Sequence, residues 1–318
     1  MRILLTGSSG WLGRFLAPML REAGHEVVGL DVAAGEATTV LGSVADRALI
    51  DETFARHAIE AVVHAGALHK PDIARYPAQA FVDVNITGTL NLLEAAVAAK
   101  HDRFVFTSTT SLMISAAIRA EAQDEAVWLD EDTAPLEPRN IYGVTKLAAE
   151  NLCRCQHLER GLPCVVLRTA RFFPEEDDMA HTQRTSGPNT KANELLHRRL
   201  TVEDAARAHL VALERAPSVG FGSYIVSAPT PFAKEDCRDL KRDAAGVVGR
   251  LFPQAAELYA QKGWQLPPTI GRIYDASRAE RELGFRCATT FETVLAALRN
   301  GDALPFIHDP SYTSPKLR

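Results

Sequence analysis

The 318-residue sequence predicts an α/β fold, a doubly wound parallel sheet with a smaller α/β substrate domain toward the C-terminus. Three observations predict it. Short apolar segments alternate with helical ones, and the first apolar segment runs into a glycine-rich turn. After Arg168 the regular alternation gives way to acidic, polar and loop-like segments. Such alternation favours parallel strands because each crossover helix packs on a face of the sheet. The expected strands are Arg2–Thr6, Glu26–Asp31, Thr39–Gly42, Ala61–Ala67, Phe104–Phe106 and Cys164–Arg168.

The first turn, from Thr6 to Gly13, follows a strand and opens an amphipathic helix. Gly7 suits a tight turn that a Cβ would block, Gly10 permits close approach of the backbone to a pyrophosphate, and Gly13 permits close helix packing. The helix start offers N–H groups and a positive dipole end to phosphates. The pattern is typical of Rossmann-type dinucleotide sites. It predicts cofactor contacts from Gly7, Ser9, Gly10, Trp11, Leu12 and Gly13.

Asp31 ends the second strand, where a carboxylate can accept hydrogen bonds from the adenosine ribose. The same charge would repel a 2′-phosphate, so the sequence favours NAD over NADP. The alternative is a glycine turn in another α/β fold, since a lone glycine motif is weak evidence. The context of strand, turn, helix, strand and acid argues against that alternative.

Composition and charge exclude several classes. The net charge is −5 without a basic block, which argues against a nucleic-acid partner, and no apolar run is long enough to span a membrane. The chain begins directly with a strand, so we expect a cytoplasmic protein without a signal peptide. The five cysteines form no Cys-x-x-Cys pair and no zinc spacing, so we expect reduced thiols and no metal.

Two histidines and one long helix have alternative interpretations. His64 lies within a strand, which favours a structural role over a catalytic one, whereas His69 in the next loop either touches substrate or faces solvent. A long helix is expected within Pro77–Lys100, with apolar positions on more than one face. Such a helix is buried or packs on a partner chain.

The chemistry is expected near the fifth strand and the helix that starts after Asn140. The strand ends in the hydroxyl cluster 107–111, and Tyr142 and Lys146 lie one helical turn apart on one face. A nearby ammonium stabilises a phenolate, which suits tyrosine to acid–base work. A hydroxyl of Thr109 or Ser108 can bind the same substrate oxygen. The hydride must go to a cofactor, because side chains do not accept hydride.

These motifs resemble the extended short-chain dehydrogenases/reductases of the NAD-dependent epimerase/dehydratase group, which includes UDP-glucose 4-epimerase. Further matching segments are 64–67, 85–96, 202–208 and 274–284. The resemblance implies that Thr109 is the catalytic hydroxyl, Tyr142 the acid/base, and Lys146 the residue that lowers its pKa and holds the nicotinamide ribose. It implies a homodimer through the helices around 85–99 and 142–159. It also implies cofactor contacts from Ala65, Gly66, Ala67, Asn85, Thr107, Ser108, Thr169 and Ala170.

Several residues depart from the family pattern. Ser43 stands where an acid usually meets the adenine, so only Ser43 and Val44 can offer that contact. Arg171 stands where the sugar-nucleotide members place an asparagine, and it either binds a carboxylate or phosphate or lies at the surface. We expect substrate contacts from His69, Thr109, Thr110, Arg171 and Asn193. The NAD domain is expected to be 1–168, with 200–228 returning to it, and the substrate region 169–199 and 229–318.

The sequence therefore predicts an NAD-dependent oxidoreductase or epimerase that transfers hydride at a secondary alcohol or ketone of a small, sugar-like substrate. Two alternatives stay open. One is a nucleotide-sugar 4-epimerase without net redox, and the other is a non-catalytic NAD-binding regulatory protein, since fold alone does not fix function. The second alternative predicts a damaged tyrosine–lysine pair, and here both residues are present.

Overall fold

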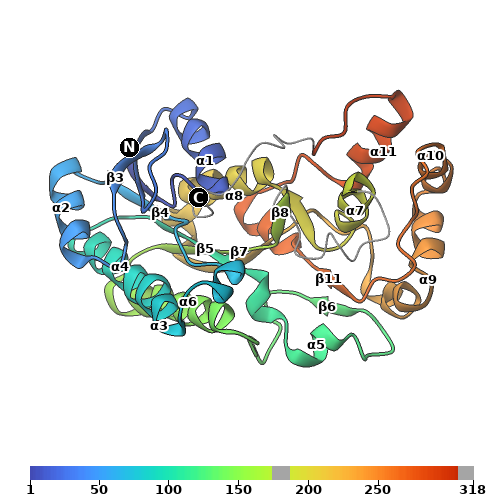
Figure 1. Ribbon diagram of the computed structural model, residues 1–318, viewed down its shortest axis with the longest axis horizontal. Helices are drawn as coiled ribbons and strands as arrows, with labels where there is room; N and C mark the ends of the chain where they lie inside the picture. The colour runs from blue at the N-terminus through green and yellow to red at the C-terminus, as the bar shows by residue number, and fades with distance from the viewer. Residues whose placement is uncertain (174–186, 307–318) are drawn as a thin grey trace.

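A seven-stranded parallel sheet lies at the centre of the computed structural model, which describes residues 1–173 and 187–306 (Figure 1). Its strand order is β10-β7-β5-β4-β1-β2-β3. The chain runs outward from β1 to β3 and then returns to β4, so the crevice between β1 and β4 lies where ligands bind in such sheets. The bounds are β1 Arg2–Thr6, β2 Glu26–Asp31, β3 Thr38–Leu41, β4 Ala61–His64, β5 Phe104–Thr109, β7 Cys164–Thr169 and β10 Phe221–Val226.

Helices cover both faces of this sheet, which confirms the doubly wound fold (Figure 1). One layer contains α1 (Trp11–Glu22) and α8 (Val202–Val219). The other contains α2 (Arg47–His57), α4 (Gly88–Ala98) and α6 (Ile141–Arg160). The central strands β4, β5 and β7 are fully buried. Burying each aliphatic side chain contributes about 1.5–3 kcal/mol, which explains why these strands are continuous apolar runs.

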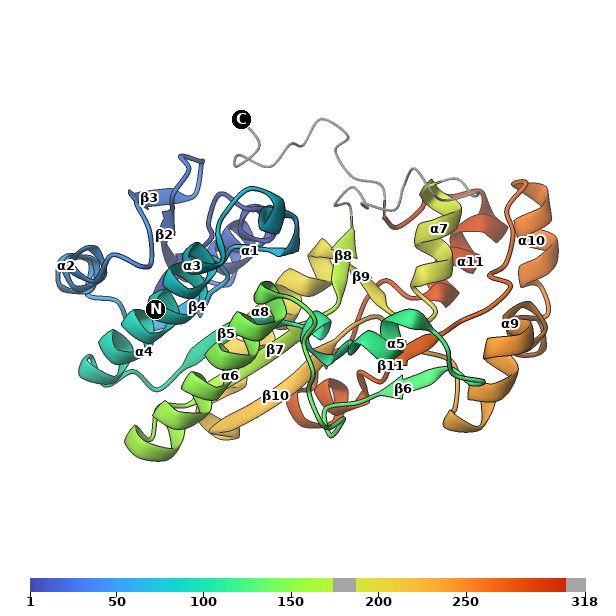
Figure 2. The same ribbon diagram turned by 60° about the horizontal axis from the view of Figure 1, so that its bottom comes forward.

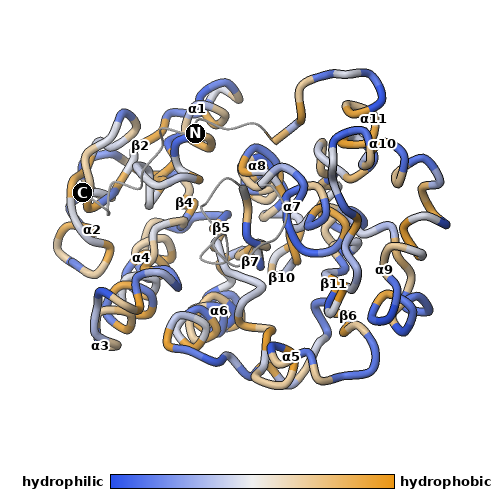
Figure 3. The backbone as a smooth tube through the Cα atoms, turned by 45° about the vertical axis from the view of Figure 1, so that its right-hand side comes forward, coloured by the Kyte–Doolittle hydropathy of each residue, from blue (hydrophilic) through white to orange (hydrophobic). Residues whose placement is uncertain are grey.

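The C-terminal helices form a second lobe with its own apolar core around Tyr259, Ile273 and Phe291 (Figure 2). Two small parallel sheets lie between the lobes, β8 (Arg171–Phe173) with β9 (Arg199–Thr201) and β6 (Val127–Leu129) with β11 (Arg272–Tyr274). Hydrophobic and hydrophilic positions alternate along α6 and α9, as expected for helices with one face on a core (Figure 3). The lobe helices are α7 Gly187–Glu194, α9 Cys237–Leu251, α10 Ala255–Gln261 and α11 Phe291–Asn300.

Two segments differ from the sequence expectation. The expected long helix is divided into α3 (Ala78–Phe81), a π-helix (Val82–Thr87) and α4. The π-helix contains Asn85, whose side chain binds both polar backbone atoms of Leu68. The stretch 114–138, which lies outside the expected strands, contains α5 (Ala116–Ala120) and β6. Periodicity did not indicate β6, because its partner β11 lies far along the chain.

Shorter helices complete the described chain. They are 3₁₀ helices at Lys70–Ala74, Thr110–Met113 and Lys234–Asp236, and a π-helix at Ala279–Leu283. None of the helices that the structure describes combines the length and the apolar character that crossing a bilayer requires. Among the same residues, no group of three or more His, Cys, Asp and Glu side chains is placed to hold a metal ion.

Candidate active site

A cavity of about 690 Å³ opens at the carboxyl ends of the central strands and reaches the second lobe. Most of the residues expected at the site line it. From the first turn and the fourth strand these are Gly7, Gly10, Trp11, Leu12, Ala65, Gly66, Ala67 and His69. From the fifth strand onward they are Thr107, Ser108, Thr109, Thr110, Tyr142, Lys146, Thr169, Ala170 and Arg171.

The glycine turn is packed so closely that side chains do not fit. A Cβ on Gly13 would lie 2.3 Å from the Gly7 carbonyl oxygen. Gly7 has a φ of +74°, and a Cβ there would lie 2.8 Å from the Gly66 nitrogen. Gly10 precedes α1 and has no side chain to cap it. The helix N-terminus therefore faces the cavity with N–H groups and a positive dipole end, which suits a pyrophosphate.

Asp31 is fixed at the end of β2 by two backbone donors. Its carboxylate accepts hydrogen bonds from Ser9 N–H and from Ala33 N–H, both at 3.0 Å. The hydroxyl of Ser9 is also used within the protein, since it donates to the Ala33 carbonyl and pairs with Thr38. Ser9 therefore joins the turn to β2 without lining the cavity. The glycine turn, the uncapped helix start and the carboxylate together fit NAD.

Tyr142 and Lys146 lie in the first two turns of α6, which Asn140 caps through a hydrogen bond from Gly143 N–H. Both residues are buried and both line the cavity. Lys146 Nζ donates to the Thr107 carbonyl at 2.7 Å and lies 4.7 Å from the Phe106 ring centroid. The ammonium is thus held on β5, one turn from the phenol, where its charge favours the phenolate.

The hydroxyls of β5 have different partners. Thr109 accepts the Ser111 N–H at 3.1 Å, which leaves its own proton to be donated into the cavity. Ser108 instead donates to Glu150 at 2.5 Å, inside the protein. Thr109 is paired in register with Thr169 of β7, which also lines the cavity. The geometry favours Thr109 over Ser108 as the hydroxyl that meets the substrate oxygen.

Two buried histidines, His64 and His209, form hydrogen bonds within the protein next to the cavity. The ring of His64 lies between the hydroxyls of Thr6 and Thr89, at 2.7 and 3.0 Å, which is a structural role. His209 binds the Ala205 carbonyl through Nδ1 and the hydroxyl of Thr107 through Nε2. Burial, with a smaller contribution from the Lys146 charge, lowers the pKa of His64 to about 3. Burial likewise lowers the pKa of His209 to about 4.

These neutral histidines predict a loss of stability in mild acid. His197 in the second lobe has a pKa lowered to about 3 by burial. Because the unfolded rings titrate near 6.5, the unfolded chain binds more protons as the pH falls below that value. The free energy of unfolding is expected to fall from about pH 6.5 to pH 4, by about 1.4 kcal/mol per pH unit for each proton taken up. Urea unfolding across this range measures the slope.

A substitution at His209 tests whether the buried histidines cause this dependence of the free energy of unfolding on pH. His209→Gln is expected to reduce the dependence of stability on pH, because it removes a ring whose pKa burial lowers to about 4. A free energy of unfolding that is constant between pH 7 and pH 5 would contradict the prediction.

Six other predicted residues do not line the cavity, namely Gly13, Asp31, Ser43, Val44, Asn85 and Asn193. The Asn85 carboxamide holds the loop after β4, because it binds Leu68 and the hydroxyl of Thr145. Ser43 and Val44 follow β3, where Ser43 accepts the Ala45 N–H. Asn193 lines a smaller cavity of about 230 Å³ and donates to the Gln265 carbonyl. The expected substrate region 169–199 lies partly outside the described residues.

The sequence interpretation missed a set of arginines. Arg119, Arg139 and Arg272 line the large cavity together with Arg171, Arg198 and Arg199. They come from α5, from the loop before α6 and from β11, so no local spacing connects them. The one available signal was the position of Arg139, just before Tyr142.

Comparisons with known proteins agree with this geometry. The model of the NAD dependent epimerase/dehydratase family matches residues 3–226. The UDP-glucose 4-epimerase of Rhizobium meliloti (strain 1021) is 33% identical over 175 residues, which are 52% of this chain and 50% of that protein. The L-arabinose 1-dehydrogenase (NAD(P)(+)) of Haloferax volcanii is 35% identical over 175 residues, 52% of this chain and 65% of that one.

The fold extends further than these alignments. A short-chain dehydrogenase/reductase superfamily protein from Agrobacterium tumefaciens, solved with bound NAD, superposes with a TM-score of 0.65 and 23% identity. The superposition covers 95% of this chain and 98% of that one. The match with the first curated relatives, in contrast, spans about half of their length.

Proposed function

This chain belongs to the NAD-dependent epimerase/dehydratase family, and from that premise we propose an enzyme that transfers hydride at a secondary alcohol or ketone of a sugar-like substrate. NAD is its cofactor. The observation that carries the proposal is the intact group of Thr109, Tyr142 and Lys146 in one cavity with the glycine turn. That group also argues against a non-catalytic regulatory protein.

The side chains have separate tasks. Tyr142 exchanges a proton with the substrate oxygen, Lys146 holds its charge near the phenol, and Thr109 donates its free proton to the same oxygen. When bound, NAD would supply the hydride acceptor and donor for the reacting carbon. The buried walls around Tyr142 exclude water, which strengthens the effect of the Lys146 charge. The chain therefore supplies positioning, proton transfer and electrostatic stabilisation.

The cofactor contacts follow from the same placement. The glycine turn and the start of α1 would hold the pyrophosphate, Asp31 the adenosine ribose, and Lys146 the nicotinamide ribose. Ser43 and Val44 are proposed for the adenine. Residues 1–168 with 200–228 form the NAD domain in this proposal, and 169–199 with 229–318 form the substrate region.

A nucleotide-sugar 4-epimerase is the second candidate, since several relatives are named UDP-glucose 4-epimerase. The two candidates differ in net redox. A panel of free sugars, uronic acids, nucleotide sugars and small hydroxy-carbonyls, assayed with NAD and NADP, separates them. NADH absorbance that appears with substrate supports the dehydrogenase, and isomerised product without it supports the epimerase. Neither signal with any member of the panel would contradict the proposal.

The Asp31→Ala variant is expected to bind NAD more weakly and to discriminate less against NADP. The carboxylate is positioned by two backbone N–H groups, so its removal takes away the ribose acceptor and the charge that repels a 2′-phosphate. We expect NAD affinity to fall by about 10-fold or more, as for the loss of a charged hydrogen bond. Titration with NADH and NADPH measures both. An unchanged ratio of the two affinities would show that Asp31 does not contact the ribose.

We further propose a cytoplasmic homodimer. Val144 and Leu158, on the long helix α6, are 47% and 70% exposed, so both apolar side chains are accessible to a partner chain. This placement supports association through α4 and α6. Sedimentation of the purified chain as a monomer at micromolar concentration would contradict it.

A further inference from the structure

Arg272 is a buried cation with an incomplete set of partners. It is 8% exposed, lies on β11 and lines the large cavity. Within residues 1–173 and 187–306, its Nε and Nη1 atoms have no hydrogen-bond partner. A guanidinium that is buried without hydrogen-bond acceptors is unfavourable. Because Arg272 also lines the cavity, its missing acceptors indicate a ligand that accepts hydrogen bonds.

The nearest acid does not satisfy this charge. Glu121 Oε1 lies 3.7 Å from Arg272 Nη1, beyond hydrogen-bond distance, and the Glu121 side chain is 44% exposed. Glu121 is also shared, because Lys241 Nζ lies 3.9 Å from its other carboxylate oxygen. One half-exposed carboxylate thus faces two cations, which leaves an excess of positive charge.

Two further arginines add to this excess. Arg139 donates through Nε to the Ile114 carbonyl and lines the same cavity as Arg119 and Arg272. All three guanidinium groups line one cavity. Burial, followed by the charges of Arg119 and Arg272, lowers the pKa of Arg139, as expected for neighbouring cations. By contrast, Arg198 and Arg199 both pair with Glu194. The group formed by Arg119, Arg139 and Arg272 is called here the arginine cluster.

We propose that the arginine cluster binds an oxyanion of the substrate, a carboxylate or a phosphate, so that the sugar-like substrate is an acidic one. The inference rests on the proposed function for the reaction, but the anion site itself rests on Arg272. Guanidinium groups bind both anions through paired N–H donors in a plane. Because the cluster and Tyr142 line one cavity, a bound anion orients the sugar toward the acid/base.

Binding to an inactive holoenzyme separates this inference from turnover. Calorimetric titration of the Tyr142→Phe variant, saturated with NADH, uses galactose, galacturonate, galactose 1-phosphate and UDP-galactose as probes. At least one anionic probe is expected to bind 10-fold or more tightly than galactose, and the tightest of them identifies carboxylate, phosphate monoester or diphosphate as the source. Arg272→Gln is expected to remove about 10- to 100-fold of that affinity, as for a lost charged hydrogen bond.

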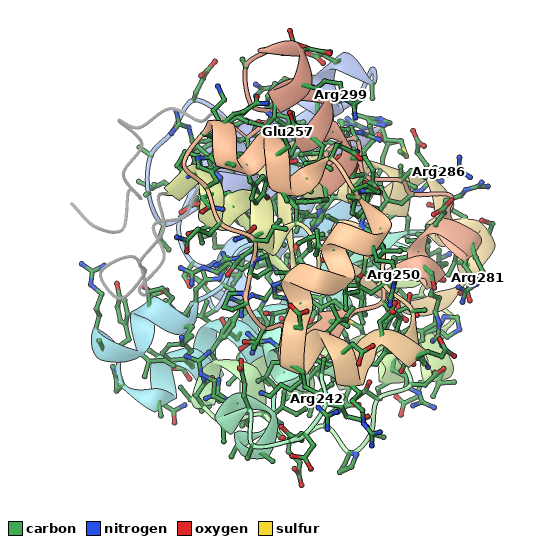
Figure 4. All side chains as sticks on the ribbon, turned by 90° about the vertical axis from the view of Figure 1, so that its right-hand side faces the viewer. Arg242, Arg250, Glu257, Arg281, Arg286 and Arg299 are labelled. Carbon is green, nitrogen blue, oxygen red and sulfur yellow. The ribbon has the colours of Figure 1, made fainter. Side chains whose placement is uncertain are left out.

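Two variants control for folding and for net charge. Arg139→Gln changes an exposed residue of the cluster and is expected to weaken the same probe. Arg299→Gln changes an exposed arginine on α11, at the outer surface, and is expected to leave it unchanged (Figure 4). NADH affinity is expected to be equal in all three, since the cluster lies outside the glycine turn.

A second measurement does not depend on the choice of sugar. With NADH saturating, inorganic phosphate is expected to raise the thermal unfolding midpoint of the wild type and of Arg299→Gln more than that of Arg272→Gln. The anion site would be overturned by two results together. Phosphate would stabilise all three proteins equally, and the anionic probes would either bind no better than galactose or keep their affinity in Arg272→Gln. Charge-dependent binding without turnover of any sugar would overturn the proposed function and leave the anion site in place.

Discussion

Replacing Tyr142 with phenylalanine is expected to lower kcat by about 10²- to 10⁴-fold, the usual contribution of a positioned acid or base. The substitution removes one hydroxyl and keeps the ring, which lies 5.9 Å from the His69 ring and packs with Leu68 and Phe81. Lys146 stays on the Thr107 carbonyl, so the cofactor site is preserved. NADH binding and the unfolding midpoint are therefore expected to be unchanged while turnover is lost.

The matched control is Tyr259→Phe in the second lobe. Tyr259 is 1% exposed, and its hydroxyl has no hydrogen-bond partner among the described residues. Removing this hydroxyl is expected to leave turnover unchanged and stability equal or higher. Turnover of Tyr142→Phe within a few-fold of the wild type, measured with the substrate found by the panel, would remove Tyr142 from the mechanism.

The seven-stranded sheet and its glycine turn were predictable because their signals are local. The turn from Gly7 to Gly13 needs glycine where a Cβ would collide with backbone, as the 2.3 Å contact at Gly13 shows. The central strands are continuous apolar runs, because both of their faces are covered by helices. Thr109, Tyr142 and Lys146 were expected together from strand order, and they line one cavity.

The substrate half was less predictable because its contacts are between distant segments. β6 forms only because Val127 pairs with Arg272, which lies in another part of the chain. The arginine cluster combines α5, a loop and β11, and each arginine alone is indistinguishable from a surface residue. The π-helix at Val82–Thr87 was also not predicted, and it contains Asn85, whose side chain accepts the Leu68 N–H from a preceding loop.

The role of Ser108 also depends on a contact between distant segments, which the sequence does not show. The hydroxyl pattern by itself left both Ser108 and Thr109 open, because the two residues end the same strand, and only the family resemblance implied Thr109. The structure separates them through Glu150, which accepts the Ser108 hydroxyl and leaves Thr109 to the cavity. Glu150 lies one turn after Lys146 on α6, so the carboxylate also joins the catalytic helix to β5 and β7.

Removing Glu150 is expected to have the largest effect on stability. Its carboxylate binds Arg168 at 2.8 Å, and the two side chains are 5% and 8% exposed. Loss of one partner leaves a buried charge without compensation, which costs about 3–5 kcal/mol. Glu150→Leu is therefore expected to lower the free energy of unfolding by about that amount. Urea unfolding of the holoenzyme at pH 7 measures it, with Glu159→Leu at the exposed end of α6 as the control.

The double variant Glu150→Leu with Arg168→Met distinguishes a lost ion pair from lost packing. When both charges are removed, no buried charge is left unpaired, and such replacements are often neutral or stabilising. Most of the stability lost in Glu150→Leu is therefore expected to return, although Ser108 loses its acceptor in both variants. A double variant as unstable as the sum of the two single variants would show no coupling. In that case Glu150 would stabilise α6 through packing, and the positions of Tyr142 and Lys146 would not depend on its charge.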